Sequence, residues 1–335
     1  MSTTTITIDE LRELGKQVLL KHGATEREAE IITEDYLDAD LRGRSSHGFT
    51  FFKYAVAAFE GRGTYEALPI DGSYLQVNGN SDLGHIVARE AIDRAIPVLS
   101  ERKVVTIGIS DITRFNCSGI IARYGAEKGA ITLVFAYGGS SVVAPPGGKA
   151  PAVNNTPIGI AIPYTDPLFV LDMATSERAW GHLTLAKYSK KNIPTHWGVN
   201  EDGLPIDDPS EVKWLSPLGG YKGFGLALAF EILGGALVRV PIGTKGPGKN
   251  RGTLIQLIDP SIFGHTADSF REQVTSFLAE LSEIPTIDPN QTITYPGQRS
   301  EQRYIETLNS GVIELHQSVI DYLHEQLRTK SHPTN

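Results

Sequence analysis

Between Tyr74 and Phe135, short apolar runs rich in β-branched residues alternate with longer stretches whose apolar residues recur at helical spacing. The first kind predicts strands and the second predicts helices. We expect strands at 74–77, 104–109 and 131–135, and helices near 83–95 and 120–128. Alternation of this kind is typical of an α/β layer, so the chain is expected to fold around a sheet that helices cover.

The Pro- and Gly-rich segment 144–176 predicts a hairpin. Two apolar runs, 157–163 and 168–173, are separated by the turn formers 164–167. Asp172 lies near the end of the second run, and Thr175 and Ser176 follow at an expected helix start. A carboxylate here can accept hydrogen bonds from ribose hydroxyls, and free N–H groups can bind phosphate. The structural alternative is an ordinary helix cap after a strand.

Two capping boxes mark the starts of two N-terminal helices. Thr7 with Glu10, and Thr25 with Glu28, each precede apolar residues at helical spacing. After the second helix comes the polar loop 44–48, Arg-Ser-Ser-His-Gly, which contains His47. Most single histidines are structural or solvated, but serine and glycine neighbours leave this imidazole uncovered, so His47 is a candidate acid/base.

Two further loops carry candidate anion-binding cations. Gly residues surround Lys222 in the segment 218–225, where a backbone or a ligand can approach closely. Arg114 is the one cation of the loop 110–119, which directly follows an expected strand, where ligand-facing loops of α/β sheets tend to lie. The alternatives are a Gly-rich turn with a solvated lysine and a surface arginine.

Length and composition limit the class of protein. A chain of 335 residues with 40% hydrophobic residues suggests about two domains and a sizeable core. The net charge of −8, without a run of basic residues, argues against nucleic acid and anionic membranes as partners. A small-molecule partner is expected.

The single cysteine, Cys117, excludes an intrachain disulfide, and no apolar signal segment starts the chain, so we expect cytoplasmic residence. The longest apolar run, 224–238, is too short to span a bilayer and is expected to be a buried helix.

Two common kinds of site are not supported by the sequence. No Gly-x-Gly-x-x-Gly motif follows an expected strand, which argues against an ordinary Rossmann dinucleotide site. The nine histidines show no spacing typical of zinc ligands, so no metal site is expected.

Several motifs taken together resemble the type-2 malate/L-lactate dehydrogenase family, which includes sulfolactate, ureidoglycolate and diketogulonate oxidoreductases and cyclic-imine carboxylate reductases. The resemblance covers nearly the whole chain in order, and Tyr-Pro-Gly-Gln looks most like the ureidoglycolate branch. The motifs that carry it are Arg42–Gly43, Ser46–Gly48, Asn155–Ile158, Asp172–Ser176, the Ile193–Pro209 loop, Gly220–Gly225 and Tyr295–Gln298.

The resemblance implies a fold, a cofactor and a set of site residues. It implies NAD or NADP bound without a Rossmann fold, on a largely antiparallel sheet covered by helices, with a second, helical domain and a homodimeric assembly. His47 matches the family's acid/base, and Ser46 matches the serine that orients substrate or cofactor beside it. The positions that match cofactor contacts are Asp172, Met173, Ala174, Thr175, His182, Lys222, Gly297, Gln298 and Arg299.

The chain also departs from the family's pattern at three positions. Arg114 stands where a histidine is usual, and that histidine is catalytic in ureidoglycolate members. Phe51 stands where many members have an arginine that holds the substrate carboxylate, and His182 stands where lysine is common. The reaction class is therefore better supported than the substrate, and Arg114 is the candidate to replace the missing carboxylate ligand.

The resulting hypothesis is an enzyme of the α/β class. We expect a helical domain from residues 1–72 and 222–335 and a dinucleotide-binding α/β domain from residues 73–221. The expected activity is hydride transfer between the nicotinamide and a small 2-oxo or 2-hydroxy acid of the malate, lactate or ureidoglycolate type. Two alternatives stay open: a cyclic-imine carboxylate reductase, and a paralogue that binds the dinucleotide without the usual catalysis.

Overall fold

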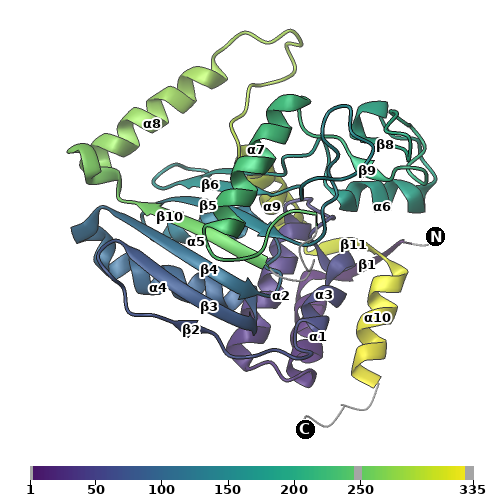
Figure 1. The fold of residues 1–335 in the computed structure, drawn as a ribbon, viewed down its shortest axis with the longest axis horizontal. Coiled ribbons are helices and arrows are strands. Elements are labelled where there is room, and N and C mark those ends of the chain that lie inside the picture. Colours follow the sequence, from purple (N-terminus) through teal and green to yellow (C-terminus); the bar gives the residue numbers. More distant parts are fainter. Residues whose placement is uncertain (1–2, 245–250, 329–335) are drawn as a thin grey trace. The chain divides into compact units, whose positions relative to one another are not determined.

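The computed structural model describes residues 3–244 and 251–328, which form two compact units (Figure 1). Unit 1 comprises residues 1–62 and 297–335, and unit 2 comprises residues 63–296. Both ends of the chain thus contribute to one unit, and the whole middle of the chain forms the other.

Unit 1 is mainly helical. Its elements are β1 (Thr3–Thr7), α1 (Ile8–Lys21), α2 (Glu26–Leu41), the 3₁₀ turn η1 (Phe49–Phe51), α3 (Lys53–Ala57), α9 (Gln298–Ser310), β11 (Val312–His316) and α10 (Gln317–Arg328). The predicted caps are confirmed: the Thr7 hydroxyl accepts from the Glu10 N–H, and Thr25 and Glu28 form a complete capping box. The strands β1 and β11 pair antiparallel, which joins the two ends of the chain.

Unit 2 contains the main sheet. Its elements are β2 (Glu66–Ala67), β3 (Tyr74–Asp82), α4 (Gly84–Arg102), β4 (Val104–Ile112), α5 (Ser118–Glu127), β5 (Ile131–Gly138), β6 (Ile158–Ile162), β7 (Phe169–Met173), α6 (Trp180–Ser189), η2 (Thr195–Trp197), β8 (Gly198–Val199), β9 (Trp214–Leu215), α7 (Tyr221–Glu231), the π-helical turn η3 (Ile232–Ala236), β10 (Arg251–Ile258), η4 (Pro260–Phe263) and α8 (Ala267–Ser282). The order of the sheet is β2-β3-β4-β10-β5-β6-β7. Only β3 and β4 pair parallel, and every other pair is antiparallel.

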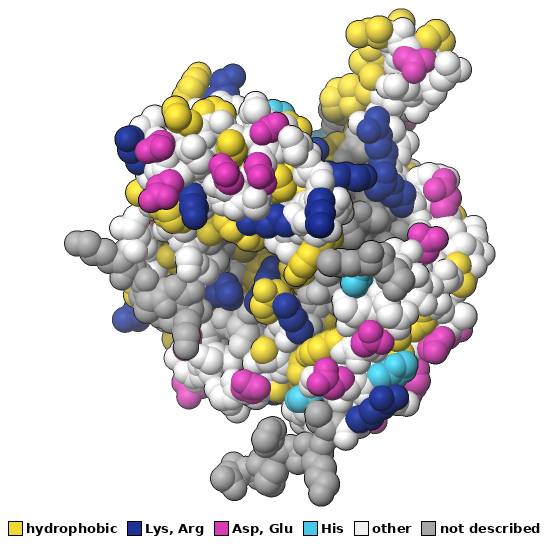
Figure 2. All heavy atoms as spheres, turned by 90° about the vertical axis from the view of Figure 1, so that its right-hand side faces the viewer, with side chains coloured by type: hydrophobic (Ala, Val, Ile, Leu, Met, Phe, Trp, Pro, Cys, Tyr) yellow, Lys and Arg dark blue, Asp and Glu magenta, His cyan; other side chains and the backbone are white. Residues whose placement is uncertain are grey.

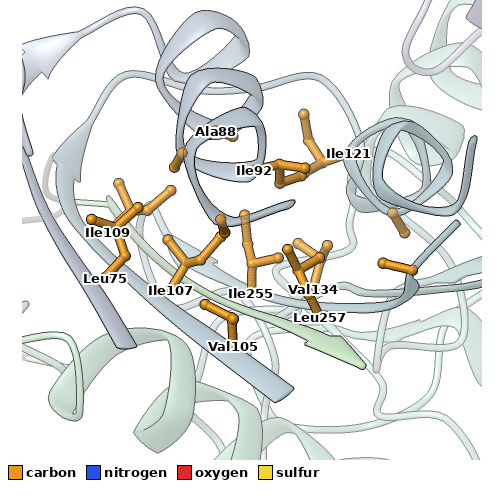
Figure 3. Packing of buried hydrophobic residues seen from close by; sticks show 14 of the residues in the cluster. Leu75, Ala88, Ile92, Val105, Ile107, Ile109, Ile121, Val134, Ile255 and Leu257 are labelled. Atoms are coloured by element: carbon orange, nitrogen blue, oxygen red, sulfur yellow. The ribbon is translucent and has the colours of Figure 1, made fainter. Parts of the chain in front are cut away.

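The main core lies between the sheet and the helices α4 and α5 (Figure 3). Ile92 and Ile121 face the sheet from these helices, and Ile107 and Ile255 point toward them from β4 and β10. Neighbouring residues of the strands point to the opposite face, where Phe135 and Leu254 pack near η3. The predicted strand and helix alternation and the 157–173 hairpin are confirmed, because β6 and β7 pair antiparallel.

The structure corrects the expected burial of residues 224–238. Only a narrow stripe of α7, Gly223, Ala227 and Glu231, is buried. Leu226, Leu228, Ile232 and Leu237 are exposed on the single chain. Part of the apolar run is therefore not covered by the described residues of this chain.

The compact units also differ in their bounds from the expected domains. Residues 222–296 belong to unit 2, because β10 pairs with both β4 and β5 in the middle of the sheet.

None of the helices in the described ranges combines the length and the apolar character that a membrane span requires. Figure 2 shows basic, acidic and hydrophobic side chains interspersed over one face of the molecule.

Candidate active site

The candidate acid/base His47 lies in the loop that follows α2 in unit 1. The backbone N–H of His47 donates to the Arg44 carbonyl at 2.8 Å, which closes a tight turn. The hydroxyl of Ser46, itself buried, lies 3.0 Å from His47 Nδ1. This contact fixes one ring nitrogen, and the half-buried ring keeps access to solvent. A half-buried imidazole held by a hydroxyl suits a group that exchanges protons.

A carboxylate from α2 supports this loop from within the unit. Asp40 Oδ2 accepts a hydrogen bond from the Phe49 N–H at 2.7 Å. A Cβ built on Gly48 would lie 1.8 Å from Asp40 Oδ1, so only glycine allows the loop to pass this close. Burial raises the pKa of Asp40 to about 7, and the hydrogen bond from Phe49 opposes this rise. The Asp40 side chain is half-buried.

The expected cofactor residues Gly297, Gln298 and Arg299 lie in the same unit, at the start of α9. Gly297 has a φ of 103°, and its carbonyl accepts from the Glu301 N–H at 2.9 Å. The Arg42 guanidinium then joins α2 to α9 through ion pairs of 2.7 Å with both Asp38 and Glu301. One buried arginine, at the end of α2 where the histidine loop begins, therefore links α2 to the first turn of α9.

In unit 2, three of the motifs that carry the resemblance meet. The Thr175 N–H donates to the Asn155 carbonyl at 3.0 Å, and the Thr175 carbonyl accepts from the Leu218 N–H at 2.9 Å. The Thr156 hydroxyl lies 3.3 Å from both the Thr175 hydroxyl and the Ala227 carbonyl of α7. Segments 155–156, 172–176 and 218–227 therefore pack against one another through buried contacts.

Asp172 and Lys222 belong to two of these segments. A Cβ built on Gly119 would lie 2.8 Å from Asp172 Oδ2, so the carboxylate rests against the first turn of α5. An acidic group there stabilises the helix through its dipole, so the capping alternative has a physical basis beside the ribose hypothesis. Lys222 is exposed in the first turn of α7, and Gly223 packs against Leu218. An exposed cation at a helix N-terminus suits a phosphate.

The remaining expected cofactor residues of unit 2 differ in their surroundings. Met173 and Ala174 are half-buried beside Thr175, at the end of β7. His182 lies on α6, where burial and the nearby Arg178 lower its pKa. Its buried Nδ1 has no hydrogen-bond partner among the residues that the structure describes. A neutral imidazole with an unsatisfied nitrogen can bind a polar ligand group.

The Tyr-Pro-Gly-Gln motif passes along the edge of the sheet. The Tyr295 hydroxyl donates to the Pro167 carbonyl at 2.9 Å, and the Pro296 carbonyl accepts from the Val170 N–H at 3.0 Å. The ring of Tyr295 also stacks on Phe169 at 6.3 Å between centroids. The motif covers β7 next to Asp172, which gives Tyr295 and Pro296 a structural role.

Arg114 lies in the loop between β4 and α5, as expected, and is half-buried. Sequence reasoning missed its neighbour Arg251, the first residue of β10. Burial lowers the pKa of Arg251, and the charge of Arg114 lowers it further. No local signal marks Arg251, because the sheet register brings it there. Asp40, also missed, did have a signal: it continues the helical stripe of Ile32 and Tyr36 at a position where an apolar residue is expected.

No group of three or more His, Cys, Asp or Glu side chains within residues 3–244 and 251–328 is arranged to hold a metal ion.

Comparison with known proteins places the chain in a family. The family model described as malate/L-lactate dehydrogenase matches residues 6–324. The malate/(S)-sulfolactate dehydrogenase of Methanothermus fervidus is 30% identical, over 96% of both chains. The NAD(+) ureidoglycolate dehydrogenase of Escherichia coli O157:H7 is 27% identical, over 95% of this chain and 94% of the relative. The chain belongs to the malate/L-lactate dehydrogenase family.

A solved structure supports the same fold. The malate dehydrogenase of Entamoeba histolytica superimposes with a TM-score of 0.90 over 99% of both chains, at 22% identity. At that identity the likeness shows the fold alone.

Proposed function

We propose that the protein is an NAD(P)-dependent oxidoreductase that transfers hydride between C4 of the nicotinamide and the α-carbon of a small 2-oxo or 2-hydroxy acid. The observation that carries the proposal is the meeting of segments 155–156, 172–176 and 218–227 in a chain that matches the family model over residues 6–324. The nicotinamide supplies the hydride, and the protein's own groups bind, orient and move the proton.

His47 is the proposed acid/base of the reaction. During reduction its ring nitrogen donates a proton to the carbonyl oxygen of the substrate, and during oxidation it accepts the proton from the hydroxyl. Ser46, 3.0 Å from Nδ1, holds the ring in one orientation. An imidazole titrates near neutral pH, which suits both directions.

The residues proposed to hold the dinucleotide fit such a ligand. Lys222 offers an exposed charge to a phosphate, and the His182 Nδ1 and the Asp172 carboxylate offer polar groups to ribose or amide. Met173, Ala174, Thr175, Gly297, Gln298 and Arg299 complete the proposed set. Because no Gly-x-Gly-x-x-Gly motif follows a strand, we propose that this binding uses a non-Rossmann arrangement on the largely antiparallel sheet.

Arg114 is the proposed ligand of the substrate carboxylate. Its planar guanidinium can hold a carboxylate by two parallel hydrogen bonds, which compensates for Phe51 at the position where many members of the family have arginine. Lys53 and Arg44 are alternatives with less suitable geometry.

We also propose a homodimer and residence in the cytoplasm. The exposed apolar side chains of Leu226, Leu228, Ile232 and Leu237 support association through α7 and η3. A single buried cysteine, Cys117, suits a reducing compartment.

The function is tested by binding and by turnover. Fluorescence titration with NADH and NADPH measures the affinity for each cofactor. Absorbance at the nicotinamide band then reports turnover with a panel of 2-oxo acids, ureidoglycolate and cyclic-imine carboxylates. Reduction of a 2-oxo acid or oxidation of a 2-hydroxy acid is expected. Turnover of the imines alone supports an imine reductase instead, and binding without turnover across the panel supports a binding paralogue.

A further inference from the structure

The loop that carries His47 is held at both ends by one residue of α2. Before His47, the Gly43 N–H donates to the Asp40 carbonyl at 2.9 Å. After it, the side chain of Asp40 takes over, and Oδ2 accepts from the Phe49 N–H at 2.7 Å. His47 lies between these two contacts, so the path of the backbone on either side of it depends on Asp40.

Phe49, the donor at the far end of the loop, is a fixed point of the helical unit. Its buried ring stacks on Phe52 at 4.6 Å between centroids and meets the edge of Tyr36 at 6.4 Å. A Cβ built on Gly15 of α1 would lie 3.0 Å from Phe49 Cζ, so the ring also packs closely on that helix. The Asp40 carboxyl therefore ties the loop to a residue that apolar packing holds in place.

No space separates the residue after His47 from the Asp40 carboxyl. The three atoms nearest to a Cβ built on Gly48 all belong to this group: Oδ1 at 1.8 Å, Cγ at 2.2 Å and Oδ2 at 2.5 Å. Gly48 has a φ of −86°, which any residue adopts, so the carboxyl and not the backbone conformation excludes a side chain here. The backbone next to His47 thus rests directly on Asp40.

Stability alone does not account for an acid at this position. Asp40 continues the helical stripe of the buried residues Ile32 and Tyr36, where an apolar residue is expected. Burial raises the pKa of Asp40 to about 7, so its ionised form is disfavoured in the fold. An apolar side chain would avoid this cost but could not accept from the Phe49 N–H. Exceptions of this kind to local rules are expected at functional sites.

We propose that Asp40 is a positioning residue for catalysis, whose carboxyl fixes the loop from which the His47 imidazole exchanges its proton with the substrate. This inference rests on the proposed function, because it takes His47 as the acid/base. Ser46, 3.0 Å from His47 Nδ1, orients the ring, and Asp40 fixes the backbone that carries both residues. A misplacement of about 1 Å in a reacting group can cost about 10²-fold in rate, so the position of this loop matters.

The first test compares two substitutions by steady-state kinetics. Asp40→Ala removes the acceptor and the packing against Gly48, so kcat of the folded protein is expected to fall about 10- to 100-fold, with KM nearly unchanged. Asp40→Asn keeps an oxygen for the Phe49 N–H and is expected to restore most of the rate. Glu30→Ala removes an exposed carboxylate from the same helix and is expected to keep the wild-type rate. A purely structural role would lower the Tm of Asp40→Ala and leave kcat of the folded protein unchanged.

The second test uses the close approach of Gly48. In the wild type, Gly48→Ala displaces the Asp40 carboxyl, so it is expected to lower kcat as Asp40→Ala does. In the Asp40→Ala background the atoms nearest to the new methyl group are absent, so Gly48→Ala should cause little further loss. Losses that add fully in the double variant overturn the proposal, because the two residues then act independently.

The third test observes His47 without catalysis. In protein labelled with ¹³C at histidine Cε1, the variant His47→Asn identifies the His47 resonance. Asp40→Ala is expected to shift or broaden this resonance and to leave those of the other histidines in place, whereas Asp40→Asn should keep it sharp. An unchanged His47 resonance in Asp40→Ala overturns the proposal.

The outcomes separate this inference from the proposed function. Wild-type kcat in Asp40→Ala overturns the positioning role and leaves the oxidoreductase intact. Equal losses in Asp40→Ala and Asp40→Asn also overturn it, because the rate then follows the acidic proton and not the hydrogen-bond acceptor. A His47 resonance that changes in Asp40→Ala, in a protein that turns over no 2-oxo acid, supports the control of the loop by Asp40 and contradicts the proposed function.

Discussion

In unit 1 the buried guanidinium of Arg42 lies between two carboxylates, whereas in unit 2 the half-buried Arg251 lies beside a second arginine. Burial alone would lower the pKa of Arg42, but Asp38 and Glu301 raise it above its ordinary value. The pKa of Arg251 is lowered, because burial and Arg114 act in the same direction. The charge of Arg42 is thus neutralised within the fold, whereas Arg251 lies in the field of a like charge.

The largest effect is expected at the proposed acid/base of unit 1. His47→Asn should lower kcat by about 10²- to 10⁴-fold, because proton transfer loses its donor while the loop keeps its backbone contacts. Steady-state kinetics give the change, and circular dichroism checks that the fold persists. His265→Asn, outside the proposed site, should retain the wild-type rate. Near-normal turnover of His47→Asn removes this residue from the mechanism.

The next largest effect is expected on the free energy of unfolding when Arg42 is replaced. Arg42→Ala leaves Asp38 and Glu301 without their partner and removes a cation–π contact with Tyr304, so the free energy of unfolding should fall by about 2 to 4 kcal/mol. Arg12, in the same unit, also pairs with two acids but is 29% exposed, so Arg12→Ala should cost only about 0 to 1 kcal/mol. Urea unfolding of both variants measures the difference. Equal losses would contradict the structural role given to burial here.

A smaller effect is expected when the fork of Arg114 is replaced. Arg114→Lys keeps the charge but offers one point contact in place of two parallel hydrogen bonds. The resulting fall in kcat/KM should correspond to a loss of about 1.5 to 3 kcal/mol in transition-state stabilisation. Affinity for NADH should change little, and the free energy of unfolding should not fall as it does for Arg42→Ala. Wild-type kcat/KM in both Arg114→Lys and Arg114→Ala assigns the carboxylate to another residue.

The smallest effect is a pH dependence of unit 1. Unfolded aspartic acid releases its proton near pH 3.8, whereas folded Asp40 keeps it to about 7. The folded state holds the extra proton between these values, so rising pH lowers the free energy of unfolding in this window. Asp40→Asn keeps an acceptor for the Phe49 N–H but has no proton to release. Between pH 5 and 6.5 its free energy of unfolding should therefore fall by about 1 to 2 kcal/mol less than that of the wild type. Parallel pH dependences of the two proteins would contradict the raised pKa.

Features that depend on neighbouring residues were predictable from the sequence. The helix starts at Thr7 and Thr25 follow from capping boxes, and the β6–β7 hairpin follows from its turn formers. The His47 loop and the Arg114 loop were found because each follows an element whose end is visible in the sequence. The resemblance then supplied residues, such as His182, that no local pattern indicates.

Features that depend on long-range pairing were not predictable. The β1–β11 pair joins residues some three hundred positions apart, and no alternation near Thr3 indicates its partner. Arg251 meets Arg114 only through the register of β10 against β4. The exposure of α7 was missed because hydrophobicity shows that a surface must be covered, but not whether the same chain covers it.

The central claim, hydride transfer to the α-carbon of a 2-oxo acid, is tested most directly with a labelled cofactor. NADH or NADPH carrying deuterium at C4 is incubated with the protein and oxaloacetate, and the product is analysed by NMR and mass spectrometry. The account predicts a 2-hydroxy acid with deuterium on the carbon that bears the new hydroxyl. Binding of the cofactor without deuterium in the product of any 2-oxo acid would contradict it.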